Sequence, residues 1–197
     1  GRGAPARAPD LEAAYQQARA SIAFTAQDIR DIREGRLRIT HRPFSSRFAP
    51  GGVWHHMLED ITSVPSAYCS FGMPGDWVWV REAYALEDNR IVYAADLEPD
   101  QLGRYRLLPS RRMAKHQSRM LLRLERVEPK WFLDITAEEI QAEGCPPAYL
   151  EDTRAMWAWW TMRWTALIAG SFARMRHVPL SMHMPVWALW FTVFETR

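Results

Sequence analysis

The sequence predicts an α+β protein whose sheet is mostly antiparallel and barrel-like, with helices at its periphery. Its 197 residues are enough for one globular domain with a substantial core. Hydrophobic residues make up 48% of the chain and charged residues 24%, which excludes a disordered or fibrous protein. The segments with strand character are short and do not alternate regularly with helices, and this order indicates the α+β class.

The predicted strands are short runs of β-branched and aromatic residues. They cover residues 21–25, 37–40, 77–84, 90–94, 118–127 and 186–194. The clearest of them follows Pro74 and Gly75, which fit the two central positions of a type II turn. Two short helices are expected beside the strands. One covers residues 26–34 and ends at Gly35, and the other covers residues 136–143 and begins with a capping box.

Two further segments complete the predicted domain organisation. Residues 1–20 are polar and Ala-rich and predict a peripheral N-terminal arm, which leaves residues 21–197 as a single domain. That domain includes a Trp-rich helix at about residues 152–176. Arg163 lies at the centre of its apolar stretch and is costly in hydrocarbon, so we expect this helix to pack within the protein rather than to span a membrane.

The cations of the chain are almost all arginines, with 23 Arg beside two Lys and a net charge of +2. This excess has two explanations: a bias of the coding sequence, or guanidinium groups that hold phosphate or carboxylate in two-pronged hydrogen bonds. Two cysteines are too few for a disulfide framework, and the N-terminal residues lack the apolar core of a signal peptide, so we expect a cytoplasmic protein. No Gly-rich phosphate loop, G-x-S-x-G or HExxH pattern is present, and no cofactor or metal site is predicted.

Four segments, in this order, resemble the ASCH-domain family, a PUA-like β-barrel family, and in particular its bacterial and phage members. They are IAF leading to EGRLRITHR, GMPGDWVWVREAY, PSRRMAKHQSRMLLRL and DITAEEIQAEG. The most specific of them is the second, because family members typically read PGD-x-[LI]-WVRE there. The resemblance implies a small PUA-like barrel with a cleft that is proposed to bind RNA or modified nucleosides.

The resemblance also bears on catalysis. Some small ASCH proteins hydrolyse the amide of N4-acetylcytidine with a Lys, a Thr and a Glu. The Thr corresponds to Thr40 and the Glu to Glu143, but Leu37 stands where the Lys is expected. Arg36 and Arg38 are poor substitutes for it, since a guanidinium keeps its proton. Thr40 and Glu143 are therefore candidate catalytic residues, and whether the protein is an enzyme stays open.

Binding depends less on the missing lysine. Arg36, Arg38 and Arg42 lie at even-numbered positions with Thr40, so along a strand they share one face. Further cations and an aromatic stacking face lie within the other motifs. The full set of candidate ligand-binding residues is Arg36, Arg38, Arg42, Trp79, Arg81, Glu82 and Arg111.

The sequence thus favours a protein that binds RNA, or a modified nucleoside or nucleotide, in a basic cleft. The first alternative is an enzyme, either an amidohydrolase of the N4-acetylcytidine type or an RNA nuclease. The second is an interaction protein of phage or mobile-element origin, in which the cleft is vestigial and the Trp-rich helix presents a surface to a partner.

Overall fold

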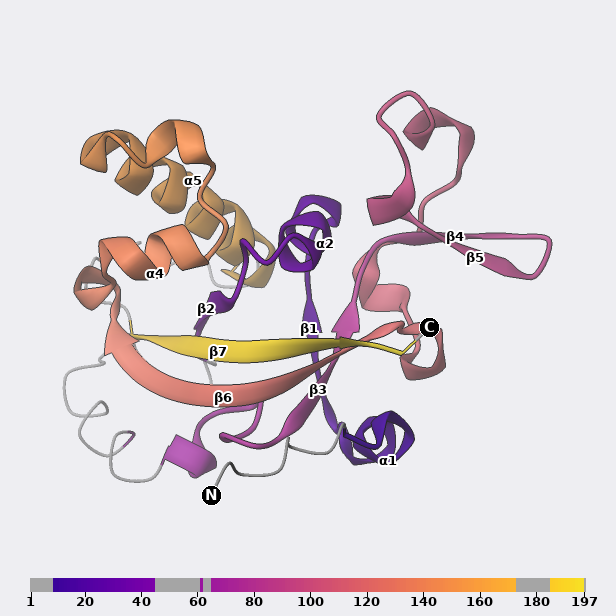
Figure 1. Ribbon diagram of the computed structural model, residues 1–197, viewed down its shortest axis with the longest axis horizontal. Coiled ribbons are helices and arrows are strands. Elements are labelled where there is room, and N and C mark those ends of the chain that lie inside the picture. The colour runs from indigo at the N-terminus through magenta and orange to yellow at the C-terminus, as the bar shows by residue number, and fades with distance from the viewer. Residues whose placement is uncertain (1–8, 45–60, 62–64, 173–184, 197) are drawn as a thin grey trace, which may run out of the picture.

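A five-stranded sheet with the order β1-β3-β6-β7-β2 forms the centre of the protein (Figure 1). The computed structural model describes residues 9–44, 61, 65–172 and 185–196. The strands are β1 (Ala20–Ala23), β2 (Ile39–Pro43), β3 (Trp77–Arg81), β6 (Met120–Trp131) and β7 (Pro185–Glu195). Only β1 and β3 pair in parallel, and the long strands β6 and β7 curl the sheet into a half-barrel. The predicted α+β class with a mostly antiparallel sheet is confirmed.

A two-stranded hairpin of β4 (Tyr84–Glu87) and β5 (Arg90–Tyr93) projects from this sheet (Figure 1). Its two turn residues, Asp88 and Asn89, both have positive φ, as a tight hairpin turn requires. The prediction of one continuous strand over residues 77–84 is therefore wrong. The strand ends at Arg81 because Glu82 turns inward to a buried ion pair, and the chain then enters the hairpin.

Among the described residues, the α-helices around the sheet are α1 (Leu11–Gln17), α2 (Ala26–Arg33), α4 (Ala137–Ala142) and α5 (Thr153–Phe172). The predicted capping box at Thr136 is confirmed, and a capping box that was not predicted begins α2 at Thr25. The last four residues of the predicted Trp-rich helix, 173–176, lie outside the described residues. Short 3-10 turns link the elements: η3 (Pro65–Ala67), η4 (Ala94–Asp96), η5 (Leu102–Arg104), η6 (Ser110–Arg112), η7 (Lys115–Gln117), η8 (Phe132–Asp134) and η9 (Pro147–Tyr149).

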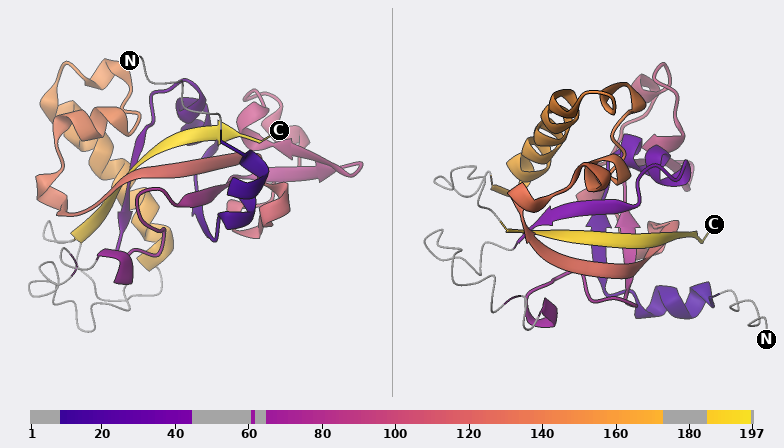
Figure 2. Two further views of the ribbon diagram at one scale, coloured as in Figure 1. Left: turned by 60° about the horizontal axis from the view of Figure 1, so that its bottom comes forward. Right: turned by 60° about the vertical axis from the view of Figure 1, so that its left-hand side comes forward.

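The helices cover both faces of the sheet, and α1 and α2 lie on opposite sides of it (Figure 2). The main core lies between the sheet and α2, where Ile29 and Ile32 meet Leu122. On the other face, Ala14 and Ala18 at α1 pack against Leu121. The alternation of side chains along β6 therefore divides its apolar residues between two layers.

Helix α5 packs mainly against α4 and η9, and Val186 at the start of β7 belongs to the same apolar cluster. Trp160 and Trp164 are buried there among Ile140 and Val186. Within the described part of the chain, no helix is both long and apolar enough to cross a bilayer. The expectation that the Trp-rich helix packs within the protein is confirmed for these two tryptophans.

Candidate functional site

The buried carboxylate of Glu143 lies at the junction of α4, β2 and α5. Glu143 ends α4, and the next residue, Gly144, turns the chain with a positive φ of 88°. Its carboxylate accepts hydrogen bonds from the His41 backbone amide at 3.0 Å and the Trp160 indole Nε1 at 2.8 Å, and its Oε2 lies 2.6 Å from His41 Nδ1. The carboxylate is thus fixed by three donors from two other elements.

The predicted pair of Thr40 and Glu143 is brought together. Thr40 Oγ1 lies 3.4 Å from Glu143 Oε1, and both side chains are buried. Leu37, in the place of the expected lysine, pairs with Glu143 through a single backbone bridge and packs into the main core. The predicted strand over residues 37–40 accordingly begins two residues late, at Ile39.

Electrostatics keep Glu143 ionised. Burial alone raises the pKa of its carboxyl, but the charge and hydrogen bond of His41, followed by the charge of Arg163, outweigh burial and lower the pKa to about 2. A carboxylate with so low a pKa is a weak proton acceptor at neutral pH. Its contacts are those of a structural anchor.

A pocket of about 740 Å³ opens between the end of β1, the first turn of α2 and one side of α5. Its apolar wall includes Phe24, Trp159 and Leu167. Its charged lining comprises three arginines and two aspartates, namely Arg36, Arg42, Arg163, Asp28 and Asp31. The volume and this mixture of apolar walls with a few polar groups are those of small-molecule sites, which span about 300–1,000 Å³.

Arg42 enters the pocket from β2 and is only 9% exposed. Its Nη2 donates a hydrogen bond to the Ala23 carbonyl at 2.9 Å, and its guanidinium lies 5.0 Å from the centre of the Phe24 ring. No described residue accepts from its Nε. Burial is the largest effect and lowers the pKa of Arg42 to about 10. Repulsion from Arg163 and Arg81 also lowers this pKa, whereas attraction by carboxylates raises it.

Arg163 enters the pocket from the opposite side, on α5. Its Nη1 donates to Asp28 Oδ1 at 2.6 Å, while its Nε lies 3.8 Å from Glu143 Oε1, too far for a hydrogen bond. The Nε and Nη2 groups have no acceptor among the described residues. The guanidinium also lies 5.7 Å from the centre of the Trp159 ring. Sequence reasoning did not identify Arg163 as a site residue, although a charged residue inside an apolar helix was a signal that could have found it.

The other predicted arginines are dispersed. Arg36 lines the pocket, but its Nη2 pairs with Asp31 at 2.5 Å and with Glu34 at 2.7 Å. Arg38 and Arg111 are exposed and do not line the pocket, so the expected shared face of even-numbered residues does not form. That expectation fails because the strand begins only at Ile39, after Arg38.

The aromatic residue and the acidic residue predicted in the PGD motif face elsewhere. Val78 and Val80 point into the main core, so by alternation Trp79 faces the other side and packs near Ala14 of α1. The Trp79 stacking face is therefore not in this pocket, where Trp159 and Phe24 supply the aromatic surface instead.

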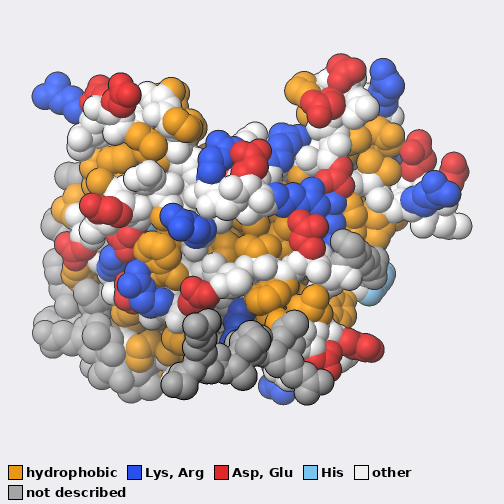
Figure 3. Space-filling model, in the orientation of Figure 1, with side chains coloured by type: hydrophobic (Ala, Val, Ile, Leu, Met, Phe, Trp, Pro, Cys, Tyr) orange, Lys and Arg blue, Asp and Glu red, His pale blue; other side chains and the backbone are white. Residues whose placement is uncertain are grey.

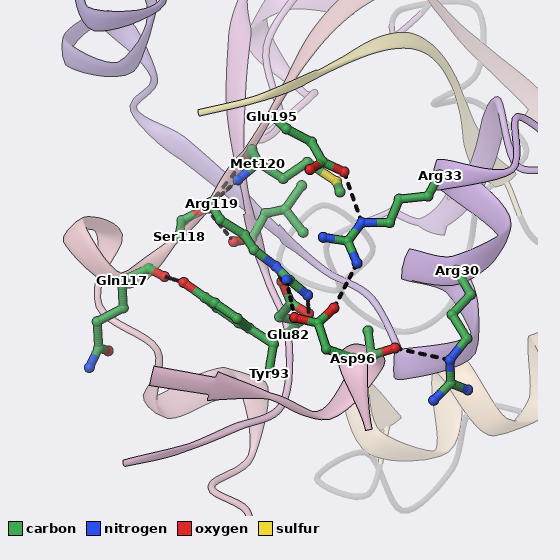
Figure 4. Close-up of polar contacts among 12 residues, drawn as sticks. Arg30, Arg33, Glu82, Tyr93, Asp96, Gln117, Ser118, Arg119, Met120 and Glu195 are labelled. Carbon is green, nitrogen blue, oxygen red and sulfur yellow. Dashed lines mark hydrogen bonds and ion pairs between the residues drawn. The ribbon is translucent and has the colours of Figure 1, made fainter. Parts of the chain in front are cut away.

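Glu82 is held in a two-pronged pair with Arg119, at 2.9 Å for both hydrogen bonds (Figure 4). Asp96 bonds the same guanidinium and is linked in turn to Arg33. Glu82 is thus part of a closed ion-pair network and has no role in the pocket. Arg81 does not line the pocket, although it is near enough to Arg42 to lower the pKa of that group.

The face of the molecule shown in Figure 3 carries basic and acidic side chains in alternation rather than one continuous basic patch. The described residues also contain no group of three or more His, Cys, Asp or Glu arranged to hold a metal ion. The lining of the pocket offers hydrogen bonding by guanidinium and carboxylate groups against aromatic walls.

Comparisons with known proteins give likenesses of structure only. No model of a protein family matches the chain, and no curated protein matches it. One similar solved structure is the ASCH domain of Lactobacillus crispatus JV V101. It has 11% identity and a TM-score of 0.46, over 93% of this chain and 90% of that one. The chain is similar to an ASCH domain.

A second similar structure is a protein of Enterococcus faecalis V583 described by the family model DUF984. It has 11% identity and a TM-score of 0.45, over 89% of this chain and 80% of that one. At this identity and these TM-scores we draw neither a family membership nor a function from the two likenesses.

Proposed function

We propose that the pocket between α2 and α5 binds RNA or a modified nucleoside or nucleotide, with one base or nucleoside inside it. The single observation that carries this proposal is the combination of aromatic walls with unpaired guanidinium donors in one volume of about 740 Å³. A nucleobase has two apolar faces and a polar edge, and both aromatic rings and guanidinium planes bind such faces.

The polar lining supports recognition of a base edge. Arg42 and Arg163 offer hydrogen-bond donors for oxygen atoms of a bound nucleoside or nucleotide. Trp159 and Phe24 stand at the pocket wall beside these two arginines.

Calorimetric titration with cytidine, N4-acetylcytidine and cytidine 5′-monophosphate tests this proposal. We expect binding of at least one of them, and a loss of about tenfold in affinity for Trp159→Ala, as base stacking is worth about 1–3 kcal/mol. Met162→Ala is the matched control, because Met162 lies on the same helix and is 66% exposed. Absence of binding to all three ligands, or equal affinity of the Trp159→Ala protein, would overturn the proposal.

Hydrolysis by Thr40 and Glu143 is a second candidate, favoured by the 3.4 Å separation of their oxygens. The low pKa of Glu143 and the burial of both side chains give it less support than binding. We expect no conversion of N4-acetylcytidine to cytidine, and no cleavage of RNA, when products are followed by chromatography. Turnover that disappears in Thr40→Val would make the protein an enzyme.

An interaction protein with a vestigial cleft is the third candidate. It needs an exposed tryptophan face on α5, but Trp160 and Trp164 are buried against α4 and β7. These contacts favour packing over a partner surface.

A further inference from the structure

Arg42, which is buried, and Arg163, which is half-buried, line one pocket and keep hydrogen-bond donors without an acceptor. The Nε of Arg42 and the Nε and Nη2 of Arg163 have no acceptor in the described part of the chain. A buried donor that lacks a partner destabilises the protein, and more so when the donor is charged. Unpaired donors of this kind in a pocket point to a ligand that supplies the acceptors.

The charge of Arg42 also lacks a dedicated counterion. Glu143, which attracts it, is bonded to His41 and Trp160. Asp28 accepts a hydrogen bond from Arg163 and another from the Thr25 amide. Burial lowers the pKa of Arg42 to about 10, which is the expected response of a desolvated cation without a partner of its own.

The first turn of α2 borders the same pocket. Its capping box uses the amides of Thr25 and Asp28, while those of Ala26 and Gln27 donate to no described residue. Such first-turn amides have no acceptor within their own helix, and the helix dipole places partial positive charge there. Arg42, Arg163 and this helix start thus offer donors to one volume.

We infer that the pocket holds a phosphate monoester between Arg42 and Arg163, beside the first turn of α2. A phosphate presents three acceptor oxygens and a double negative charge, which match two forked guanidiniums and helix amides. The two aspartates of the lining do not oppose it as free charges, because Asp28 is paired with Arg163 and Asp31 with Arg36. This inference rests on the proposed function and narrows its ligand to a nucleotide, either free or at the 5′ end of an RNA strand.

Calorimetric titration of the full chain with cytidine, cytidine 5′-monophosphate and inorganic phosphate tests the inference. We expect the nucleotide to bind at least tenfold more tightly than the nucleoside, and phosphate to compete with it. Arg42→Gln and Arg163→Gln are each expected to lower nucleotide affinity at least tenfold. The affinity for cytidine is expected to change by a smaller factor. Arg154→Gln is the matched control, because Arg154 is exposed on the first turn of α5 and does not line the pocket.

The two sources of phosphate are separated by short RNA oligonucleotides with a 5′-phosphate or a 5′-hydroxyl. Tighter binding of the 5′-phosphorylated strand than of the free nucleotide assigns the site to RNA ends, and the reverse order assigns it to free nucleotides. Either order supports a phosphate site, whereas equal binding of the phosphorylated and hydroxyl strands, together with no preference for the nucleotide over cytidine, overturns it.

The failures of the two proposals differ. If cytidine binds as tightly as its monophosphate, the phosphate site is wrong and the nucleoside pocket stands. If phosphate and nucleotide bind equally well, and cytidine does not bind, the phosphate site stands and base recognition is wrong. Thermal melting of each variant checks folding; if Arg42→Gln fails to fold, Arg163→Gln decides, and nucleotide affinity unchanged in that protein overturns the inference.

Discussion

Two clusters of buried arginine differ in how their donors are used. In the first, Arg119 pairs with both oxygens of Glu82 and with Asp96, and its guanidinium lies 3.8 Å from the centre of the Tyr93 ring (Figure 4). In the second, Arg42 and Arg163 lie at the pocket and keep three donor groups without a described acceptor.

The difference separates two uses of the same side chain. A guanidinium bonded at all three of its nitrogens links elements of the fold, as Arg119, directly before β6, joins Glu82, directly after β3, to Asp96 of η4. A guanidinium that is desolvated but incompletely hydrogen-bonded keeps donors that a ligand can bind. The large number of arginines in the sequence therefore has no single cause. The share of its hydrogen-bond donors that have acceptors shows whether a guanidinium links elements of the fold or can bind a ligand.

The largest effect is expected from Arg119→Met. This change leaves Glu82, which is 2% exposed, as a buried carboxylate without its main partner. We expect the free energy of unfolding to fall by about 3–5 kcal/mol in urea denaturation, with no change in ligand affinity of the folded fraction. Arg123 is exposed on β6, the strand that directly follows Arg119, and Arg123→Met serves as the control, with an expected change below about 0.5 kcal/mol. A loss for Arg119→Met as small as that of the control would contradict the structural role.

The next effect concerns Glu143. Both oxygens of its carboxylate have hydrogen-bond partners, whereas the neighbouring arginines keep donors without acceptors. Its pKa is lowered in the folded protein from 4.5 to about 2, so its contribution is present above about pH 4.5 and is lost as the pH falls toward 2. We expect Glu143→Gln to be less stable than the parent by roughly 3 kcal/mol at pH 7, and the gap to close on acidification. Urea denaturation of both proteins between pH 7 and pH 3 measures the gap; a gap independent of pH would contradict the assignment.

A smaller effect on stability is expected from Arg42→Met, the counterpart of Arg119→Met in the other cluster. Removal of Arg42 breaks one hydrogen bond to Ala23 but also removes a desolvated charge whose Nε has no partner. We expect a change of at most about 1–2 kcal/mol in the free energy of unfolding, together with loss of ligand binding. If Arg42→Met costs as much stability as Arg119→Met, the distinction between the two clusters fails.

Local signals in the sequence predicted the parts of the fold that depend on neighbouring residues. The hydrogen bond from the Asp76 amide to the Met73 carbonyl, with Gly75 at φ 96°, is the turn expected from Pro74-Gly75. The capping box of Thr136 is likewise encoded within four residues. The approach of Thr40 to Glu143 was expected only through the family resemblance, since the two residues lie 103 positions apart.

The partners of the charged residues could not be predicted in the same way. Arg163 meets Asp28 across 135 positions, and Arg119 meets Glu82 across 37. Their patterns in the sequence are similar, a charge within an apolar segment, and only the packing of distant elements decides which charge finds a full set of partners. The position of Trp79 was predicted wrongly for a related reason. The alternation of side chains along a strand shows that they point to two faces of the sheet, but it does not show which face a helix covers.

The most direct test of the central claim is to follow the Nε–H groups of individual arginines by ¹H–¹⁵N NMR during titration with cytidine 5′-monophosphate. We expect the signals of Arg42 and Arg163 to shift with the ligand and to saturate together, while that of Arg119, already bonded to Glu82, stays in place. Unchanged Arg42 and Arg163 signals at saturating nucleotide would contradict it.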